Sequence, residues 1–101
     1  METTINIGKD FNEFPGARYE ADGPGSGEEF RKILIEHLQA RHTLVIELDD
    51  AIGYGSSFLE EAFGGLVRTE GFSSEYLQAN VTLVTEQYGL EDTIWSYINE
   101  A

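Results

Sequence analysis

The residues best suited to carry chemistry in this sequence are two adjacent serines that follow a glycine-flanked turn. Ser56 and Ser57 come directly after the turn at residues 53–55, and Ser57 with Glu60 has the spacing of a capping box, so a helix is predicted to begin there. A hydroxyl at a helix N-terminus faces free amides and the positive end of the helix dipole, which favours a phosphate. The pattern makes Ser56 a candidate phosphoacceptor, although the local residues alone favour a structural role for the pair. The alternative is that Ser57 caps the helix while Ser56 only fills the turn.

Nucleophilic and metal chemistry have little support elsewhere in the chain. The Gly-x-Ser-x-Gly motif of serine hydrolases is absent. His37 and His42 are the two histidines, and His37 falls on the apolar face of a predicted helix, where a core role is expected rather than that of a catalytic base. Without cysteine, a structural zinc site would need both histidines plus carboxylates. We therefore expect no metal and no other cofactor.

Two further segments have the residue types of a ligand site but not its context. Glu47, Asp49 and Asp50 follow a predicted strand, where carboxylates can hold Mg²⁺, but the late lysine of a phosphotransfer receiver is missing. Solvated turn acids are the favoured interpretation, and an enzyme that uses these three acids, either a small hydrolase or a metal-dependent activity, is the third-ranked function. The glycine-rich loop at residues 22–27 lacks the lysine of a phosphate-binding loop and the spacing of a dinucleotide fingerprint.

The charge balance narrows the classes of partner. The chain has 101 residues, with 6 Lys+Arg against 19 Asp+Glu, and a formal net charge of −13. Such a surface repels nucleic-acid phosphates and anionic lipid headgroups, so no nucleic-acid and no membrane partner is expected. Among partners a basic protein is the best supported, but the favoured interpretation of the acidity is that it serves solubility alone. No stretch has the roughly 20 apolar residues of a membrane span, and residues 1–10 lack the apolar core of a secretory signal. A cytoplasmic location is expected.

Alternating strand and helix patterns must position residues 53–57, which we call the serine turn. Apolar alternation and apolar runs predict strands over residues 3–8, 17–21, 43–48 and 80–85. Helical spacing and caps predict helices over residues 26–40, 57–70 and 90–100, with a helical turn at 73–78. Strands that alternate with helices predict one α/β domain over residues 1–101, with a mixed, mostly parallel sheet and helices packed on it.

Some finer expectations follow from the same patterns. The nearly all-apolar strand 43–48 is typical of a central strand covered on both faces. On the first long helix, Phe30, Leu34 and Leu38 are predicted to be buried and Arg31 to face solvent. Gly64-Gly65 within the second helix indicates close approach of another backbone, because glycine costs about 1 kcal/mol there relative to alanine.

Residues 45–59 resemble the core signature of STAS domains (sulfate transporter and anti-sigma-factor antagonist). In that signature a hydrophobic strand ends in Asp-Leu, and Asp-Ser-Ser-Gly-Leu then opens a helix. The closer similarity is to a STAS-like group of bacterial domains of unknown function, which read Gly-Ser-Ser-Phe, an acidic residue and a Phe-Gly pair. These are residues 55–58, Glu60-Glu61 and Phe63-Gly64 here. The similarity is best over about residues 26–100 and implies a single-domain STAS-like sandwich.

The resemblance also implies a function. In the antagonists, a partner kinase that is also the anti-sigma factor phosphorylates the first serine of the pair, and that role falls on Ser56 here. We expect a non-enzymatic regulatory domain that docks a histidine-kinase-like ATPase, with contacts from Tyr54, Gly55, Ser56, Ser57, Phe58, Glu60 and Glu61. The alternative is an acidic binding module, an inhibitor or antitoxin, that acts on a basic protein without a phosphoswitch.

Overall fold

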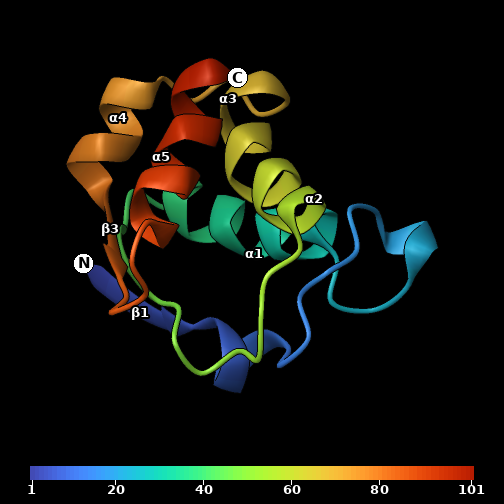
Figure 1. Cartoon of the computed structure of the whole chain (residues 1–101). Coiled ribbons are helices and arrows are strands. Elements are labelled where there is room, and N and C mark those ends of the chain that lie inside the picture. Colours follow the sequence, from blue (N-terminus) through green and yellow to red (C-terminus); the bar gives the residue numbers. More distant parts are fainter.

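Three parallel strands form one sheet, and the computed structural model describes all 101 residues of the chain. β1 (Glu2–Asn6), β2 (Thr43–Glu47) and β3 (Val81–Val84) lie in the order β1-β2-β3. Parallel neighbours need crossover connections, and such crossovers are right-handed. Because both crossovers step in the same direction across the sheet, their helices lie on one face of it, as Figure 1 shows. The predicted α/β class is confirmed, with a wholly parallel sheet.

Helical segments fill the connections between the strands and follow the last one. In chain order they are η1 (Ile7–Phe11), η2 (Glu20–Asp22), α1 (Gly27–Gln39), α2 (Ser56–Leu59), η3 (Glu60–Gly64), α3 (Gly65–Arg68), α4 (Ser74–Asn80) and α5 (Leu90–Glu100). The backbone stays helical through α2, the π-helical turn η3 and α3, so residues 56–68 form one helix, which we call the serine helix.

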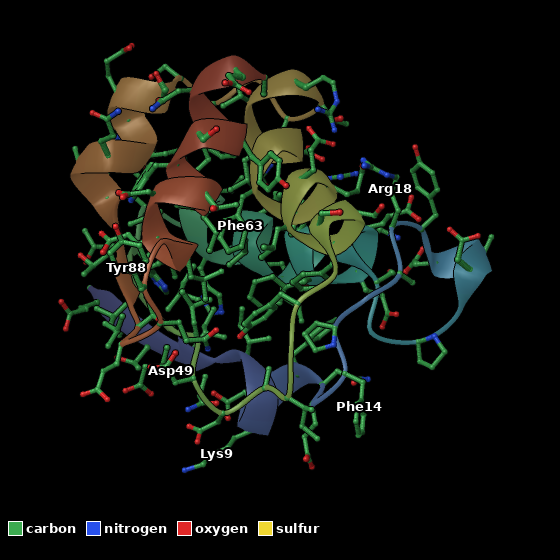
Figure 2. All side chains as sticks on the ribbon, in the orientation of Figure 1. Lys9, Phe14, Arg18, Asp49, Phe63 and Tyr88 are labelled. Carbon is green, nitrogen blue, oxygen red and sulfur yellow. The ribbon has the colours of Figure 1, made fainter.

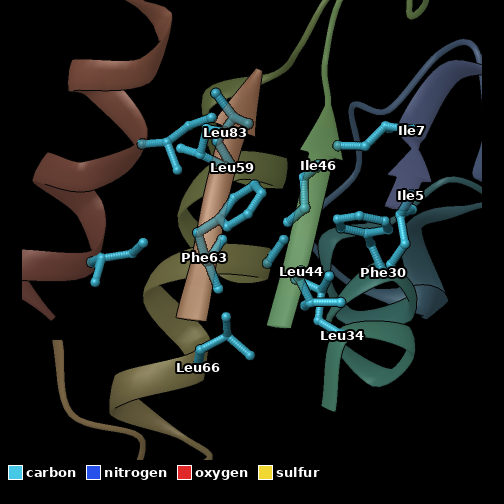
Figure 3. Packing of buried hydrophobic residues seen from close by; sticks show 14 of the residues in the cluster. Ile5, Ile7, Phe30, Leu34, Leu44, Ile46, Leu59, Phe63, Leu66 and Leu83 are labelled. Atoms are coloured by element: carbon cyan, nitrogen blue, oxygen red, sulfur yellow. The ribbon is translucent and has the colours of Figure 1, made fainter. Parts of the chain in front are cut away.

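One hydrophobic cluster of 18 buried residues lies between the sheet and the helices. Ile5, Ile46 and Leu83 lie side by side on the covered face of the sheet, and Phe30 of α1 and Phe63 of the serine helix pack above them (Figure 3). The period of two in the strands and of 3.6 in the helices brings these side chains to one interface. Each burial contributes about 1.5–3 kcal/mol, so this layer fixes where the strand ends and their loops lie.

The N-terminus of α1 explains why the strand predicted over residues 17–21 does not form. The first two amides of α1 donate to the carbonyl oxygens of Ala17 and Arg18, at 2.9 and 3.0 Å. The Glu29 amide donates to Ser26 Oγ at 3.1 Å, which confirms the predicted cap. Residues 17 and 18 therefore bond a helix end, whose first amides have no partner within the helix, and not a neighbouring strand.

The central strand is covered on one face, which corrects the expectation of cover on both. Leu44 and Ile46 point into the core and are buried, whereas Thr43, Val45 and Glu47 on the opposite face are exposed or half-buried. The reason is the topology, because two crossovers in the same direction place every helix on one side of three strands. An apolar run alone does not distinguish this arrangement from a sheet with helices on both faces.

Candidate functional site

The serine turn lies beyond the C-terminal end of β2, against a second loop. Residues 48–55 cross from β2 to the serine helix, and residues 13–16 run beside them (Figure 1). The Ile52 amide donates to Glu13 O at 2.8 Å, and the Gly55 amide donates to Pro15 O at 3.1 Å. A Cβ on Gly55 would lie 2.7 Å from Gly16 O, so only glycine fits at this contact.

Aromatic side chains hold the turn on the core. The Tyr54 hydroxyl donates to Leu48 O at 2.5 Å, and its ring lies 6.0 Å from that of Phe58, centroid to centroid. Phe58 is fully buried and also contacts Phe11 and Phe30. Burial raises the pKa of the Tyr54 hydroxyl well above its ordinary value, with a smaller contribution from nearby carboxylates. Tyr54 is therefore a neutral donor at ordinary pH, and the position of the turn is fixed.

The serine helix begins at Ser56, one residue earlier than predicted, and Gly55 is its N-cap. Ser57 is therefore not the cap, and no side chain caps this end. The first helical hydrogen bond runs from the Leu59 amide to Gly55 O at 3.1 Å, so the amides of residues 56–58 have no partner within the helix. Ser56 is exposed and Ser57 is half-buried.

This helix end differs from the other N-termini in its charge. The first turns of α1, α4 and α5 carry acidic residues, whereas the first turn of the serine helix carries none. Side-chain oxygens of Ser26 and Ser73 cap α1 and α4. In a chain of net charge −13, the start of the serine helix therefore combines free amides, an exposed hydroxyl and a first turn without a carboxylate.

The predicted contact residues divide into exposed and buried side chains. Tyr54, Gly55, Ser57 and Glu60 are half-buried and Ser56 is exposed. In contrast, Phe58 and Glu61 are buried. A partner therefore cannot touch the last two side chains directly, and they act by supporting the turn and the helix.

Two exposed apolar side chains, which the sequence patterns do not predict, lie beside the serine turn. Phe14 is 67% exposed and Ile52 is 69% exposed, and the hydrogen bond between Ile52 and Glu13 ties their loops together. Figure 2 shows Phe14 extending away from the body of the domain. Neither residue belongs to a periodic segment, so the available signal was only an apolar residue within a turn.

A network of ion pairs supports the serine helix one turn after Ser56. Arg18 Nη1 lies 2.6 Å from Glu60 Oε1, and Arg68 Nη1 lies 2.6 Å from Glu60 Oε2. Glu61 Oε2 accepts a hydrogen bond from the buried side chain of Arg31, and Glu61 Oε1 lies 3.0 Å from Arg18 Nη1. The side chain of Arg18 is labelled in Figure 2. Arg31 was predicted to face solvent, and the network is the reason that it does not.

The electrostatics of this network keep both carboxylates ionised. Hydrogen bonding from Arg68 lowers the pKa of Glu60 below its ordinary value. Burial opposes ionisation of Glu61, but hydrogen bonds from Arg31 and Arg18 outweigh it, so the pKa of Glu61 is also lowered. The guanidinium of Arg31 lies against Gly65, where a Cβ would approach Nη1 to 2.5 Å. The neighbour at Gly65 is thus a side chain and not the predicted backbone, whereas a Cβ on Gly64 would lie 2.7 Å from Glu60 Oε2 and 3.2 Å from the carbonyl oxygen of Tyr97.

The acidic cluster after β2 has a different role from metal binding. Asp49 accepts hydrogen bonds from Thr85 Oγ1 at 2.5 Å and from the Glu86 amide at 2.7 Å, which lowers the pKa of Asp49. Asp50 accepts from Asn6 Nδ2 at 2.6 Å. No group of three or more histidine, aspartate or glutamate side chains comes together as a metal site. These acids join the loops at the strand ends.

A cleft of about 390 Å³ lies elsewhere, along the free edge of β3. Its lining residues are Gln78, Val81, Thr82, Leu83, Glu91 and Trp95. None of them belongs to the serine turn or to the predicted contact set. The candidate site is therefore a surface formed by loops and a helix end, and not a pocket.

A comparison of the sequence with models of known protein families shows which family the chain belongs to. A family model described as "STAS-like domain of unknown function (DUF4325)" matches residues 26–86, which is more than half of the chain. The chain belongs to this family. The match spans α1, β2, the serine helix and β3, so the predicted resemblance to the STAS-like group is confirmed over the serine turn.

Membership gives the STAS-like fold and a domain type that is typically non-catalytic, while the family has no established function. No curated protein and no solved structure is significantly similar to this STAS-like domain. In the structure, no helix combines the length and the apolar character needed to cross a membrane.

Proposed function

We propose that this STAS-like domain is a non-enzymatic regulatory module that docks a protein partner through the serine turn. The proposed surface consists of the exposed parts of Tyr54, Gly55, Ser56, Ser57 and Glu60, with Phe14 and Ile52 beside them. Exposed apolar side chains next to a polar turn are typical of protein contact sites, because their desolvation supplies affinity while polar groups supply specificity. The two exposed apolar residues support this placement.

The proposed control is phosphorylation of Ser56 by a histidine-kinase-like ATPase, which is also the proposed partner. The Ser56 oxygen attacks the γ-phosphorus of ATP, ADP leaves, and the hydroxyl proton passes to a base on the kinase. The product adds a charge of about −2 at the end of the helix. Free amides at residues 56–58 stabilise this group, whereas its charge and bulk prevent the turn from packing on the partner.

The observation that carries the proposal is the exposed Ser56 at a helix start that has no side-chain cap and no acid in its first turn. A second candidate function has its own support, the net charge of −13, which favours an acidic module that docks on a basic protein without a switch. The two differ in their response to salt and to charge at Ser56. Binding by an acidic module without a switch weakens steeply as the ionic strength rises, and a new charge at Ser56 does not change it.

Ser56→Glu is expected to weaken partner binding by about tenfold or more, because an unpaired charge is then placed at the contact. The probe is the histidine-kinase-like ATPase retained by the immobilised wild-type domain from an extract of its source cells, and surface plasmon resonance measures its affinity. Ser56→Ala should bind like wild type.

Ser74→Glu is the matched control, because Ser74, like Ser56, is the first residue of a helix. It should leave the affinity unchanged. Equal binding by wild type and Ser56→Glu would contradict the switch, and a steep loss of binding with salt in both would support the acidic module instead.

A further inference from the structure

The two histidines of the chain meet at the end of α1. α1 ends at Gln39, and Arg41 adopts a left-handed conformation with φ 65°, which turns the chain back. The His42 amide then donates to His37 O at 3.0 Å. This turn brings Nδ1 of His42 to 3.4 Å from Nδ1 of His37. A spacing of five residues is not that of a helical metal site, and only the left-handed turn makes the two rings neighbours.

The rings face one another through these nitrogen atoms. Their centroids are 5.5 Å apart and their planes are inclined by 32°, so the two Nδ1 atoms lie between the rings. Thr3 Oγ1 of β1 lies 3.1 Å from His42 Nδ1. Neither imidazole forms an ion pair with a carboxylate. At this distance one Nδ1 can form a hydrogen bond with the other, and in the other tautomer both lone pairs can be directed at one cation.

We propose that His37 and His42 bind one divalent transition-metal ion, zinc in particular, through their Nδ1 atoms. Zinc–imidazole bonds are about 2.05 Å long, so two nitrogens 3.4 Å apart subtend an angle of about 112° at the ion. This angle is close to tetrahedral, which zinc prefers. Imidazole ligands select zinc, copper or nickel, whereas Mg²⁺ and Ca²⁺ require oxygen ligands.

The charges around His37 and His42 favour a cation, and the number of ligands limits its affinity. The C-terminal end of α1 carries the negative end of the helix dipole beside His37, and the chain has a net charge of −13. Both histidines are half-buried, so an ion can enter from solvent. No third histidine or carboxylate joins the pair, so water fills the remaining positions and an affinity in the micromolar range is expected. The ion would join the end of α1 to the start of β2.

This site is separate from the proposed docking surface. His42 immediately precedes β2, whereas the serine turn follows the other end of the same strand. Metal binding therefore does not depend on Ser56, and Ser56→Glu should leave it unchanged. If the zinc site at His37 and His42 is disproved, the proposed docking function is unaffected, and the reverse also holds.

Titration with Zn²⁺ against a chromophoric chelator tests the proposal on the intact chain. We expect one Zn²⁺ per chain, and a loss of affinity of about tenfold or more in both His37→Gln and His42→Gln. The double variant keeps the acidic surface and serves as the control for binding by carboxylates. Zinc should raise the melting temperature of the wild type and not that of the double variant.

Nitrogen NMR of the imidazole rings gives a readout that requires no variant. The chain has only two histidines, so each ring nitrogen can be assigned, and Zn²⁺ should shift both Nδ1 resonances while Mg²⁺ shifts neither. The proposal is overturned if Zn²⁺ shifts only Nε2 atoms, or if the double variant binds Zn²⁺ as tightly as the wild type.

Discussion

Glu61→Leu is expected to lower the free energy of unfolding by about 3–5 kcal/mol, a large part of the total stability of a domain of this size. The substitution removes the buried carboxylate partner of Arg31 and leaves its guanidinium only the half-buried Glu70 side chain, at 3.2 Å. Arg18 and Arg68 lose a shared partner as well. Urea denaturation followed by the fluorescence of Trp95, the only tryptophan, measures the change.

Two comparisons separate this effect from a general loss of charge. Glu20→Leu breaks the exposed pair between Glu20 and Lys32, at 2.9 Å, and should cost about 0–1 kcal/mol. Adding Arg31→Met to Glu61→Leu should restore much of the stability, because no buried charge then remains unpaired. Equal losses in Glu61→Leu and Glu20→Leu would show that the buried pair contributes no more than a surface pair.

The same network sets the direction of the pH dependence. The pKa of Glu61 is lower in the folded chain than its ordinary value, so its contribution is present above that ordinary value. The contribution is lost as the pH falls through the folded pKa. The difference in stability between wild type and Glu61→Leu should therefore shrink on acidification.

Phe58→Ala is the second large effect, with an expected loss of about 3–5 kcal/mol in the free energy of unfolding. Phe58 is fully buried, and its ring packs with those of Tyr54, Phe11 and Phe30, so its removal leaves a cavity beneath the serine turn. Thermal and urea denaturation measure the loss.

Phe14→Ala is the matched control for Phe58→Ala, because it removes the same ring from the neighbouring loop. Phe14 is exposed, so its removal should change the free energy of unfolding by at most about 0.5 kcal/mol. It should nevertheless weaken binding of the partner, whereas a drop in stability equal to that of Phe58→Ala would contradict the described packing.

The regular elements were predictable because local signals and tertiary packing agree there. The cap at Ser26 and the apolar positions Phe30, Leu34 and Leu38 predict α1, and the structure has a helix at residues 27–39. The strand over residues 43–48 and the last helix over residues 90–100 also form close to the predicted bounds. In each case one periodicity fits and a turn residue limits the element.

The remaining differences have tertiary causes. Residues 17–21 have a strand-like composition, yet the carbonyls of Ala17 and Arg18 bond the N-terminus of α1. Arg31 falls on the polar side of the helical pattern, but carboxylates from the serine helix and Glu70 surround its guanidinium. The partners of Ala17 and Arg18 are Gly27 and Glu28, and those of Arg31 lie 30 and 39 residues away, so the periodicity of one segment carries no information about them.

The candidate site was predictable at the level of its residues and less so in its geometry. The position of Ser56 at a helix start follows from the sequence, whereas the choice of Gly55 as N-cap depends on the packing of Gly55 against Gly16. The exposure of Phe14 and Ile52 depends on how two loops pair, and no periodic pattern encodes such a pairing.

The most direct test of the account is the location of phosphate after incubation with ATP and the histidine-kinase-like ATPase that the domain retains. Peptide mass spectrometry distinguishes the six serines of the chain. Phosphate is expected on Ser56 and none on Ser57, Ser73 or Ser74, with the signal lost in Ser56→Ala and kept in Ser57→Ala. An unmodified Ser56 in the presence of the active ATPase, or phosphate on a different serine, would contradict it.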